Sequence, residues 1–418
     1  MQSQTRNLMY IDMAYTVSAI KKRKHEDFFH ARHLGGYFKN VWGVHPLSDV
    51  ARGNESSKIN FTRLSPRQLI IEGVAETMPW PRVLIPLNFL VSQFQLIRLL
   101  IRLIRKHDIS VVHATDPYYG GVVGLCLKIF CGKPLVISVW GNYDDLYSEN
   151  GLLAMPRLFR WRFLEKICER IIFFSANLVV GGNWDIVRFV LNNGARKHET
   201  VMLPTSIHMH KCHFTDPCRR VGWEKVFSKF DIPLNQSYLL CIGRVIFEKH
   251  ADDALKAMKV AIDQDPSIIG IFAGEGSMRK ELEDLAASWG LKDKIKFIGN
   301  VDQETISKLI PKCIVLSPLT GMALIEAGLG GASIVAYDRD WQSDFIVNGV
   351  NGFIVKYRDY KEMGKKALQL VQNHELRSKF SLEILETALA YSDLDKIFKN
   401  QQDAYEKMFA KFDTRAER

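Results

Sequence analysis

The sequence predicts an α/β protein built from two doubly wound, Rossmann-like domains that face a cleft. Short apolar runs of strand length alternate with helical stretches in both halves of the chain, and polar, glycine-containing turns follow the runs. An irregular stretch over residues 205–235 separates the halves, and a length of 418 residues favours more than one domain. The predicted layout is therefore a first domain over 1–204, a linker over 205–235, a second domain over 236–390 and a C-terminal helix over 391–418, for which a return to the first domain is an open alternative.

Each domain is expected to contain a parallel sheet. The apolar runs predict strands at 8–11, 40–44, 109–114, 135–140 and 176–183, and at 238–242, 268–272, 295–298, 313–316 and 333–336. Helical patterns cover 25–34, 90–106 and 120–130, and the chain is helical from 361 onward, with charges on all sides of its last helix. Residues 51–67 are expected to be mostly loop.

Composition excludes several classes of protein. Seven scattered cysteines without a CxxC spacing indicate a reducing compartment and argue against structural zinc. No secretory signal is visible, and the apolar segment 83–104 carries too many polar and charged residues for a membrane span. We also expect no metal in the linker, although it contains His208, His210, His213, Cys212 and Cys218.

The positive charge is confined to the first half. Residues 1–200 contain 26 Lys and Arg against 16 Asp and Glu, whereas the rest of the chain contains 30 of each. This asymmetry suggests an anionic partner for the first domain: a membrane surface, an acidic substrate or nucleic acid. The helical stretch 90–106 and the segment 157–170 both combine basic with large apolar residues. Each is either a packed helix with a solvated basic edge or a helix at a membrane surface.

Polar residues follow the strands of the first domain. Because ligands of parallel sheets bind at the carboxyl ends of the strands, we expect these residues near one edge. They are His113, Asp116, Tyr118, Trp140, Asn142, Asp144, Asp145 and Asn183.

The stretch 317–328 in the second domain has the pattern of a phosphate cradle. A buried strand is followed by a turn through Thr320 and Gly321 and by a helix that carries Glu326. Free N–H groups at a helix start and the helix dipole both favour an anion, and Thr320 is a suitable N-cap. Gly243, Arg244 and Lys249 follow one neighbouring strand, and Gly274 and Gly276 follow another. Together they predict a site for a nucleotide diphosphate.

These motifs resemble the retaining glycosyltransferases of family four (glycosyl transferases group 1), which have the GT-B fold. Residues 241–249 are similar to the family's GR…EK motif, 272–276 to its GxGxx turn, and 350–355 to its xNGxLV turn. Residues 319–327 are similar to the second half of its E-x7-E motif. Residues 111–117 and 134–141 are similar to two motifs of the family's N-terminal domain. The resemblance covers residues 105–390 well and the first hundred residues poorly.

The resemblance implies transfer of a sugar from a nucleotide diphosphate sugar with retention, without a required metal and without a further cofactor. Arg244 and Lys249 would neutralise the leaving diphosphate, Glu326 would hold the ribose, and Phe297 lies in the strand that meets the base. The turn of Thr320, Gly321, Met322 and Ala323 would bind the distal phosphate, beside Gly243, Gly274 and Gly276. His113, Asp116, Tyr118, Trp140, Asn142, Asp144 and Asp145 would lie on the acceptor or sugar side.

Two positions depart from the family's pattern. Pro318 stands where the first Glu of E-x7-E is expected, and Trp140 replaces the usual histidine before Gly141. Both missing residues would touch the sugar or the reaction centre. Asp144, Asp145 and Tyr118 are candidates to replace these contacts.

Three functions remain open from the sequence. We favour an active glycosyltransferase on the cytoplasmic membrane face that extends a saccharide or lipid-linked saccharide in cell-surface polysaccharide or lipopolysaccharide assembly. The second is a catalytically inactive nucleotide-sugar-binding subunit, and the third is a nucleotide-sugar epimerase or phosphorylase on the same fold. Nucleic-acid binding is disfavoured, because no readout module accompanies the basic stretches.

Overall fold

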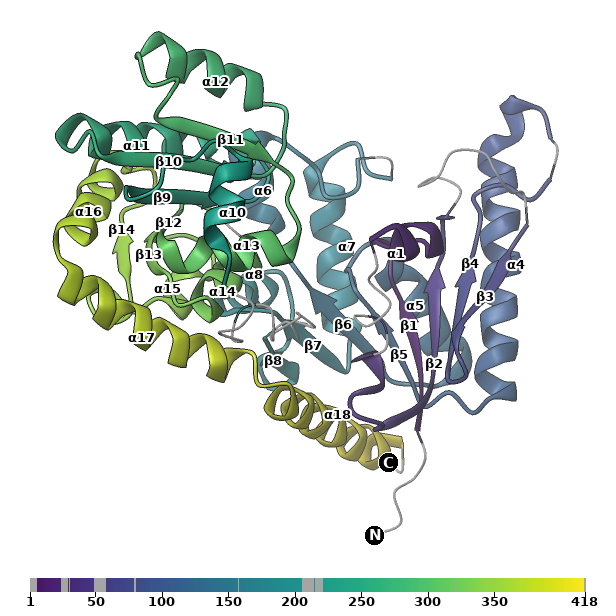
Figure 1. Cartoon of the computed structure of the whole chain (residues 1–418). Coiled ribbons are helices and arrows are strands. Elements are labelled where there is room, and N and C mark those ends of the chain that lie inside the picture. The colour runs from purple at the N-terminus through teal and green to yellow at the C-terminus, as the bar shows by residue number, and fades with distance from the viewer. Residues whose placement is uncertain are drawn as a thin grey trace. The chain divides into compact units, whose positions relative to one another are not determined.

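The computed structural model describes residues 6–23, 29, 31–48, 58–78, 80–156, 158–204, 214, 221–319 and 321–416. The chain divides into two compact units (Figure 1). The first comprises Met1–His208 together with Leu394–Arg418, and the second comprises Met209–Asp393. Each unit is an α/β layer structure around its own sheet.

The first unit contains an eight-stranded sheet in the order β3-β4-β2-β1-β5-β6-β7-β8. All neighbouring strands are parallel except the pair β3 and β4. The strands are β1 (Arg6–Ile11), β2 (Phe38–His45), β3 (Asn60–Ser65), β4 (Gln68–Glu72), β5 (Val111–Ala114), β6 (Leu135–Val139), β7 (Leu178–Gly181) and β8 (Thr200–Met202).

Four helices pack on one face of this sheet: α4 (Ile85–Lys106), α5 (Tyr119–Cys131), α7 (Arg162–Ser175) and α8 (Trp184–Asn192). The smaller elements α1 (Val17–Arg23), α6 (Tyr143–Asn150) and the 3-10 turns η1 (Ala31–His33), η2 (Arg82–Leu84) and η3 (Lys197–Glu199) complete the unit. By length and composition α4 is apolar enough to cross a membrane. Its Leu96, Leu100 and Ile104 are nevertheless buried in the core against the sheet.

The C-terminal helix α18 (Leu394–Ala416) covers the other face of the first sheet and returns along the first unit (Figure 1). Its Ala404, Tyr405, Met408 and Phe409 are buried beside strand residues such as Val111. The expectation of charges on all sides of this helix is therefore wrong. The buried residues recur at helical spacing between charged ones, so one face is apolar.

The second unit contains a fully parallel sheet in the order β11-β10-β9-β12-β13-β14. Its strands are β9 (Ser237–Ile242), β10 (Ile268–Ala273), β11 (Ile295–Gly299), β12 (Cys313–Ser317), β13 (Ser333–Tyr337) and β14 (Phe353–Val355). The helices are α10 (Trp223–Lys229), α11 (Ala251–Gln264), α12 (Arg279–Ser288), α13 (Gln303–Leu309), α14 (Ala323–Leu329), α15 (Gln342–Phe345), α16 (Tyr360–Gln372) and α17 (His374–Tyr391), with the 3-10 turns η5 (Phe247–Lys249) and η6 (Ile310–Lys312).

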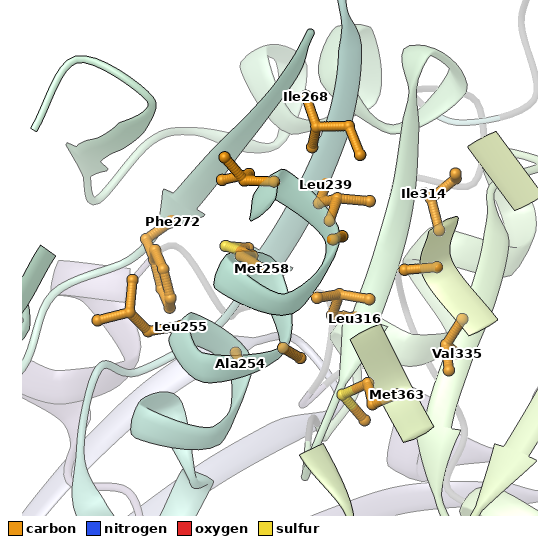
Figure 2. Close-up of a cluster of buried hydrophobic side chains, with 14 of the residues drawn as sticks. Leu239, Ala254, Leu255, Met258, Ile268, Phe272, Ile314, Leu316, Val335 and Met363 are labelled. Atoms are coloured by element: carbon orange, nitrogen blue, oxygen red, sulfur yellow. The ribbon is translucent and has the colours of Figure 1, made fainter. Parts of the chain in front are cut away.

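Apolar side chains from strands and helices meet in the core of the second unit. Figure 2 shows Leu255 and Met258 of α11 near Phe272 and Leu239 of the sheet, with Met363 of α16 beside the neighbouring strands. All of these side chains are almost completely buried. Because strands of a parallel sheet are covered on both faces, they read in the sequence as continuous apolar runs.

The structure confirms the strand positions that the apolar runs predict. Four further strands, β3, β4, β8 and β14, are not predicted, and β3 overturns part of the loop expected over 51–67, because Asn60–Ser65 pair with β4. The other differences lie at the connections. The helix α4 begins at Ile85, five residues before the expected start, because Pro86 is tolerated in a first turn. Within 221–235, assigned to the linker, α10 forms and buries Phe227 in the second unit. Most of the expected helix 25–34, much of the loop 51–67 and linker residues 205–213 and 215–220 lie outside the described residues.

Both sheets reverse their strand order at one point. In the second sheet β9 and β12 are neighbours, and in the first sheet β1 and β5 are neighbours. Ligands of open α/β sheets bind at the carboxyl ends of the two strands that flank such a reversal. The residues 243–249 and 318–326 flank this point in the second unit.

Candidate functional site

The loop after β9 presents an open glycine at the point of strand reversal. Gly243 has a φ of 134°, and a Cβ placed on it would meet no atom within 4 Å. Glycine is required here by the backbone conformation, while the space beside it is free. The next residue, Arg244, is exposed. A ligand can therefore approach the backbone of Gly243 closely and lie next to the guanidinium of Arg244.

Gly274 and Gly276 serve a different purpose from the one the sequence suggests. A Cβ on Gly274 would lie 1.8 Å from the carbonyl oxygen of Gly243, and a Cβ on Gly276 would lie 2.0 Å from that of Val245. The backbone N–H of Val245 also donates to the carbonyl of Glu275 at 2.9 Å. The two glycines thus allow the β10 loop to lie against the β9 loop. They position the loop that carries the arginine, rather than offering open space to a phosphate.

Arg244 and Lys249 bring two positive charges close together. Among the described residues, no ion pair or side-chain hydrogen bond joins either side chain to another. Burial, and then the Arg244 guanidinium, lower the pKa of the Lys249 ammonium, against the opposing effect of Asp340 and Glu248. Because the Arg244 guanidinium disfavours the charged form of Lys249, an anion bound close to both side chains would favour that form.

His250 holds the turn that carries Lys249. Its backbone is left-handed, with a φ of 51°, and its ring is buried. Arg358 donates to Nδ1 at 2.7 Å, which fixes the neutral tautomer, and Nε2 then donates to the hydroxyl of Tyr357 at 3.0 Å. Arg358 also pairs with the buried carboxylate of Asp253 at 3.1 Å. His250, Tyr357, Arg358 and Asp253 therefore form a hydrogen-bonded cluster next to Lys249 in the chain.

The turn before α14 leads to the third predicted part of the site. Gly321 and Met322 are exposed, and the helix begins at Ala323 with Met322 as its N-cap residue. No side-chain hydrogen bond caps this helix start. The suggested N-cap, Thr320, lies outside the described residues.

Glu326 is a half-buried carboxylate on α14. Burial raises its pKa to about 7. Gln303 of α13 donates to Oε1 at 3.4 Å, a long hydrogen bond. A carboxyl group that is desolvated and weakly bonded is suited to accept hydrogen bonds from a ligand hydroxyl. The helix places this group one turn after its start.

Pro318, at the position of the missing Glu, is buried. Gln342 of α15 donates to its carbonyl oxygen at 3.1 Å and also to the carbonyl of Tyr337. Ser317 donates to the same glutamine through its hydroxyl. The turn is thus held by an amide, and position 318 directs no carboxylate toward a sugar.

Phe297 of β11 belongs to the core edge. Its ring stacks on that of Phe272 with centroids 4.7 Å apart and an interplanar angle of 8°. Its carbonyl oxygen accepts a hydrogen bond from Arg279. Phe297 therefore lies at the edge of the sheet where the nucleotide base is expected, and one face of its ring is already covered by Phe272.

In the first unit, His113 is committed to internal contacts. Nδ1 lies 2.6 Å from the hydroxyl of Tyr405 on α18, and Nε2 lies 2.5 Å from that of Ser138. Burial lowers the pKa of His113 to about 3, and the nearby Arg32 acts in the same direction. The ring is neutral at physiological pH. A small cavity borders it, lined among others by Tyr10, Arg32, His113, Ser138, Trp140 and Tyr405.

Asp116 and Tyr118 are buried at the start of α5. Asp116 Oδ1 accepts the backbone N–H groups of Tyr118 at 2.8 Å and Gly120 at 3.1 Å. Burial raises the pKa of Asp116 to about 6. The Tyr118 hydroxyl donates to Glu169 at 2.5 Å. The aspartate caps the helix and the tyrosine is 1% exposed, so Tyr118 is unavailable for direct contact with a sugar.

Asp144 belongs to an ion network centred on the buried Arg162. Arg162 contacts Asp144 at 2.8 Å, Glu165 at 2.8 Å and Glu169 at 2.7 Å. Lys166 adds a second cation to Asp144 at 2.7 Å. Burial acts against ionisation, but the hydrogen bonds from Arg162, Lys166 and Asn193 hold the pKa of Asp144 below its ordinary value.

The remaining candidates of the first unit divide by exposure. Asn142 is the N-cap of α6, and its amide also donates to Asp145 and Asp185 at 3.0 Å each. Trp140 is 45% exposed. Trp140 is thus the most available of the predicted first-unit residues for a ligand.

Three contributions escaped sequence reasoning. Asp340 follows β13, and its charge acts to raise the pKa of Lys249, but no sequence motif contains it. His250 is not among the predicted site residues, and its left-handed backbone is invisible in the sequence. The third is a set of buried polar residues, Asp12, His45 and Glu72, that follow or end β1, β2 and β4 in the poorly matching first hundred residues. Among the described residues, no group of three or more His, Cys, Asp and Glu side chains has the arrangement of a metal site.

Two family models match the chain. Residues 224–384 match glycosyl transferases group 1, and residues 61–179 match Glycosyltransferase Family 4. The chain belongs to the group 1 glycosyltransferases. The two matches fall in different units, and the group 1 match contains all of the donor-site residues described above.

Similar glycosyltransferases occur in distant organisms. The alpha-monoglucosyldiacylglycerol synthase of Streptococcus pneumoniae is 21% identical over 259 residues, 59% of this chain and 56% of the relative. An uncharacterized glycosyltransferase of Methanocaldococcus jannaschii is 28% identical over 265 residues, 60% of this chain and 62% of the relative. The chain thus spans a little over half of the length of these relatives.

Solved GT-B structures share the whole fold. HepE of Anabaena, solved with UDP and glucose, matches with a TM-score of 0.70 at 15% identity and covers 96% of this chain and 100% of its own. Sucrose-phosphate synthase of Thermosynechococcus elongatus matches with a TM-score of 0.71 at 15% identity, covering 97% and 100%. The fold is therefore of the GT-B type, with two Rossmann-like domains.

Proposed function

We propose that this glycosyltransferase moves a sugar from a nucleotide diphosphate sugar to a saccharide or lipid-linked saccharide acceptor, with retention of the anomeric configuration. The observation that carries the proposal is the Arg244 and Lys249 pair beside the open Gly243, at the strand reversal of the second sheet. The complexes of HepE with UDP and with glucose, and the lipid product in the name of the pneumococcal relative, support the donor and acceptor classes.

The chemistry of this chain is electrostatic. As the bond between the anomeric carbon and the diphosphate oxygen breaks, the electron pair passes to the diphosphate. Arg244 and Lys249 stabilise that developing negative charge. The acceptor oxygen bonds to the anomeric carbon, and its proton passes to a leaving phosphate oxygen. In this scheme the two cations replace a metal ion, and no protein nucleophile is needed.

Glu326 completes the donor side. Its carboxyl group, weakly bonded to Gln303, accepts hydrogen bonds from the ribose hydroxyls. The turn over 321–323 directs backbone N–H groups to the distal phosphate. Trp140, Asp145 and the cavity beside His113 are assigned to the acceptor or sugar side, and Asp144 and Tyr118 only support the fold there.

The acceptor class and the location follow from the charge asymmetry. We assign the enzyme to cell-surface polysaccharide or lipopolysaccharide biosynthesis, at the cytoplasmic face of the membrane. The excess of positive charge in residues 1–200 suits an anionic bilayer and a lipid diphosphate acceptor.

A nucleotide panel tests the donor assignment. Thermal unfolding is followed with nucleoside diphosphates and nucleotide sugars, because a ligand of the folded state raises the melting temperature by mass action. We expect one nucleoside diphosphate to raise it and the Arg244→Ala and Lys249→Ala variants to lose the response. Wild-type protein that responds to no nucleotide would contradict the proposal.

A second candidate is an inactive binding subunit. Buried Pro318 favours it, since the donor residues remain while the carboxylate near the sugar is missing. The two functions separate in one assay: we expect an active enzyme to release nucleoside diphosphate when a lipid-linked acceptor is added. Nucleotide binding without release would favour the subunit.

A further inference from the structure

Three neighbouring helices of the first unit expose large apolar side chains on their outer side. They include Leu90 and Phe94 on α4, Ile129 and Phe130 on α5, and Phe163 and Ile167 on α7, each between 51% and 68% exposed. We name this surface the apolar face. Soluble proteins expose single apolar residues commonly, but a contiguous patch marks an interaction site.

The contacts between the helices make the face continuous. Phe89 of α4 contacts Tyr119 of α5 with ring centroids 6.0 Å apart, near the start of both helices. At the other end, Arg105 of α4 donates to the carbonyl of Phe130 at 3.4 Å. Lys128 of α5 donates to the carbonyl of Ser175 at the end of α7 at 2.6 Å. The helix α5 therefore lies between α4 and α7.

On α7 the exposed residues form a regular stripe. Phe163, Ile167, Ile171 and Phe174 are spaced by four, four and three residues, which places them on one side of a helix. The opposite side carries Ile172 and Phe173, which are buried in the core. The helix is thus apolar on two sides, and the sheet explains only one of them.

The exposed charges on the three helices themselves have one sign, and the exposed Asp108 that follows α4 pairs with Lys133. The helices α4 and α5 contain no Asp or Glu, and the two Glu residues of α7, Glu165 and Glu169, are 0% exposed and bound to Arg162. The exposed ionic groups of α4 are Arg98, Arg102, Arg105 and Lys106, and Arg170 is exposed on α7. No exposed acidic group of these three helices opposes an anionic partner.

We propose that the apolar face of α4, α5 and α7 docks on an anionic lipid bilayer, with the apolar side chains at the boundary of head groups and acyl chains and the basic residues on lipid phosphates. Amphipathic helices rich in Arg and Phe bind bilayers in this way. A partner protein would be expected to supply acidic contacts matched to individual arginines, whereas a bilayer accepts a broad, irregular apolar and basic surface. The inference deepens the membrane part of the proposed function and rests on it, but it does not require catalysis.

Vesicle co-sedimentation of the full chain tests the proposal. The probes are phosphatidylcholine vesicles with and without about 30% phosphatidylglycerol. We expect binding to the anionic vesicles, weak binding to the neutral ones, and release at high salt. Wild-type protein that ignores anionic vesicles at low salt would overturn the proposal.

Two variants separate the electrostatic from the apolar contribution to vesicle binding. The triple substitution Arg98→Gln, Arg102→Gln and Lys106→Gln removes exposed charges, and we expect the partition coefficient on anionic vesicles to fall at least about tenfold, since each interfacial charge is worth about a fivefold change. The triple substitution Phe163→Gln, Ile167→Gln and Phe174→Gln should reduce binding to a similar extent and leave no salt-resistant fraction. All six residues are exposed, so folding is retained.

A matched control lies in the second unit. The substitutions Leu382→Gln, Lys280→Gln and Lys365→Gln remove one exposed apolar side chain and two exposed cations. We expect this variant to bind vesicles as the wild type does, and an equal loss would overturn the assignment to the apolar face. Sedimentation without lipid is the second control: a dimer that the apolar triple variant converts to monomer would identify a second copy as the occupant.

The nucleotide response separates this inference from the donor assignment. All variants should retain the rise in melting temperature with nucleoside diphosphate, because the donor residues belong to the second unit. Vesicle binding without any nucleotide response would contradict the proposed function and leave the docking face standing. A nucleotide response without vesicle binding would contradict the docking face and leave the donor assignment standing.

Discussion

Two clusters of charged side chains, one in each unit, are arranged in opposite ways. In the second unit, Arg244 and Lys249 have no ion-pair partner among the described residues, and the glycine beside them faces open space. In the first unit, Arg162 is buried and shared among three carboxylates. Unpaired charges at strand ends are available to a substrate, whereas mutually satisfied charges stabilise the fold. The same residue types are thus available to the proposed donor at one cluster and support the scaffold at the other.

The largest effect on activity is expected at the donor cations. Arg244→Ala and Lys249→Ala should each lower turnover by about 10²- to 10³-fold, because each removes stabilisation of charge that develops on the leaving group. The free energy of unfolding should change by less than about 1 kcal/mol, as for other surface substitutions. Nucleoside diphosphate release and chemical denaturation measure the two quantities. Lys280→Ala, an exposed lysine of the same unit, is the control; wild-type kinetics in either donor variant would refute the assignment.

The opposite pattern is expected in the first unit. Arg162→Met leaves buried carboxylates without their cation and should lower the free energy of unfolding by about 3–5 kcal/mol. Nucleotide affinity of the folded fraction should persist, because the donor residues belong to the other unit. Urea denaturation compares this variant with Arg160→Met, which changes an exposed arginine nearby. Equal stability of the two variants would show that the network contributes little.

Glu326 connects stability with pH. Burial raises its pKa to about 7, above the ordinary value of 4.5. Between these values the unfolded chain loses the proton while the folded chain keeps it, so ionisation stabilises the unfolded state and stability falls as pH rises from 4.5 to 7. We expect Glu326→Gln to remove this fall and to gain about 2–3 kcal/mol at pH 8 but nothing at pH 4.

The control is Glu304→Gln, which changes a carboxylate on the neighbouring α13 that pairs with Lys308 at the surface. Denaturation at several pH values measures the effect. Glu326→Gln should also weaken nucleotide binding, since an amide is a poorer acceptor for ribose hydroxyls. A parallel pH profile in wild type and variant would contradict the role of burial.

The smallest effect is expected at His250, the residue after Lys249. His250→Ala removes the hydrogen bonds to Tyr357 and Arg358 and should weaken nucleoside diphosphate binding about five- to tenfold, whereas His250→Asn, which tolerates a left-handed backbone, should weaken it less. Calorimetry measures both. In a Lys249→Ala background the His250 substitution should have no further effect on affinity, because the histidine acts through the lysine. Full additivity would indicate a merely structural role.

The placement of the donor-side candidates at a strand end is predictable from the sequence, because the signals are local. The strand of 238–242, Gly243, Arg244 and Lys249 are adjacent in the chain, so one motif contains both the scaffold and the chemistry. The first-unit candidates are less informative, since strand ends collect capping residues as well as ligands. Asn142 and Asp116 are such caps. The candidates of both units lie at or near strand ends, but partners from distant segments decide which side chains remain available.

The sequence by itself determines the alternation of strands and helices, the family, the charge asymmetry and the cations of the donor site. These features depend on periodicity and on short motifs. Only the tertiary structure assigns His113 to Tyr405, which lies 292 residues away, and Asp144 to Arg162. It also buries Pro318, gives His250 its left-handed support role and gathers three apolar stripes into one face. Each of these depends on burial and long-range contact, which no local pattern encodes.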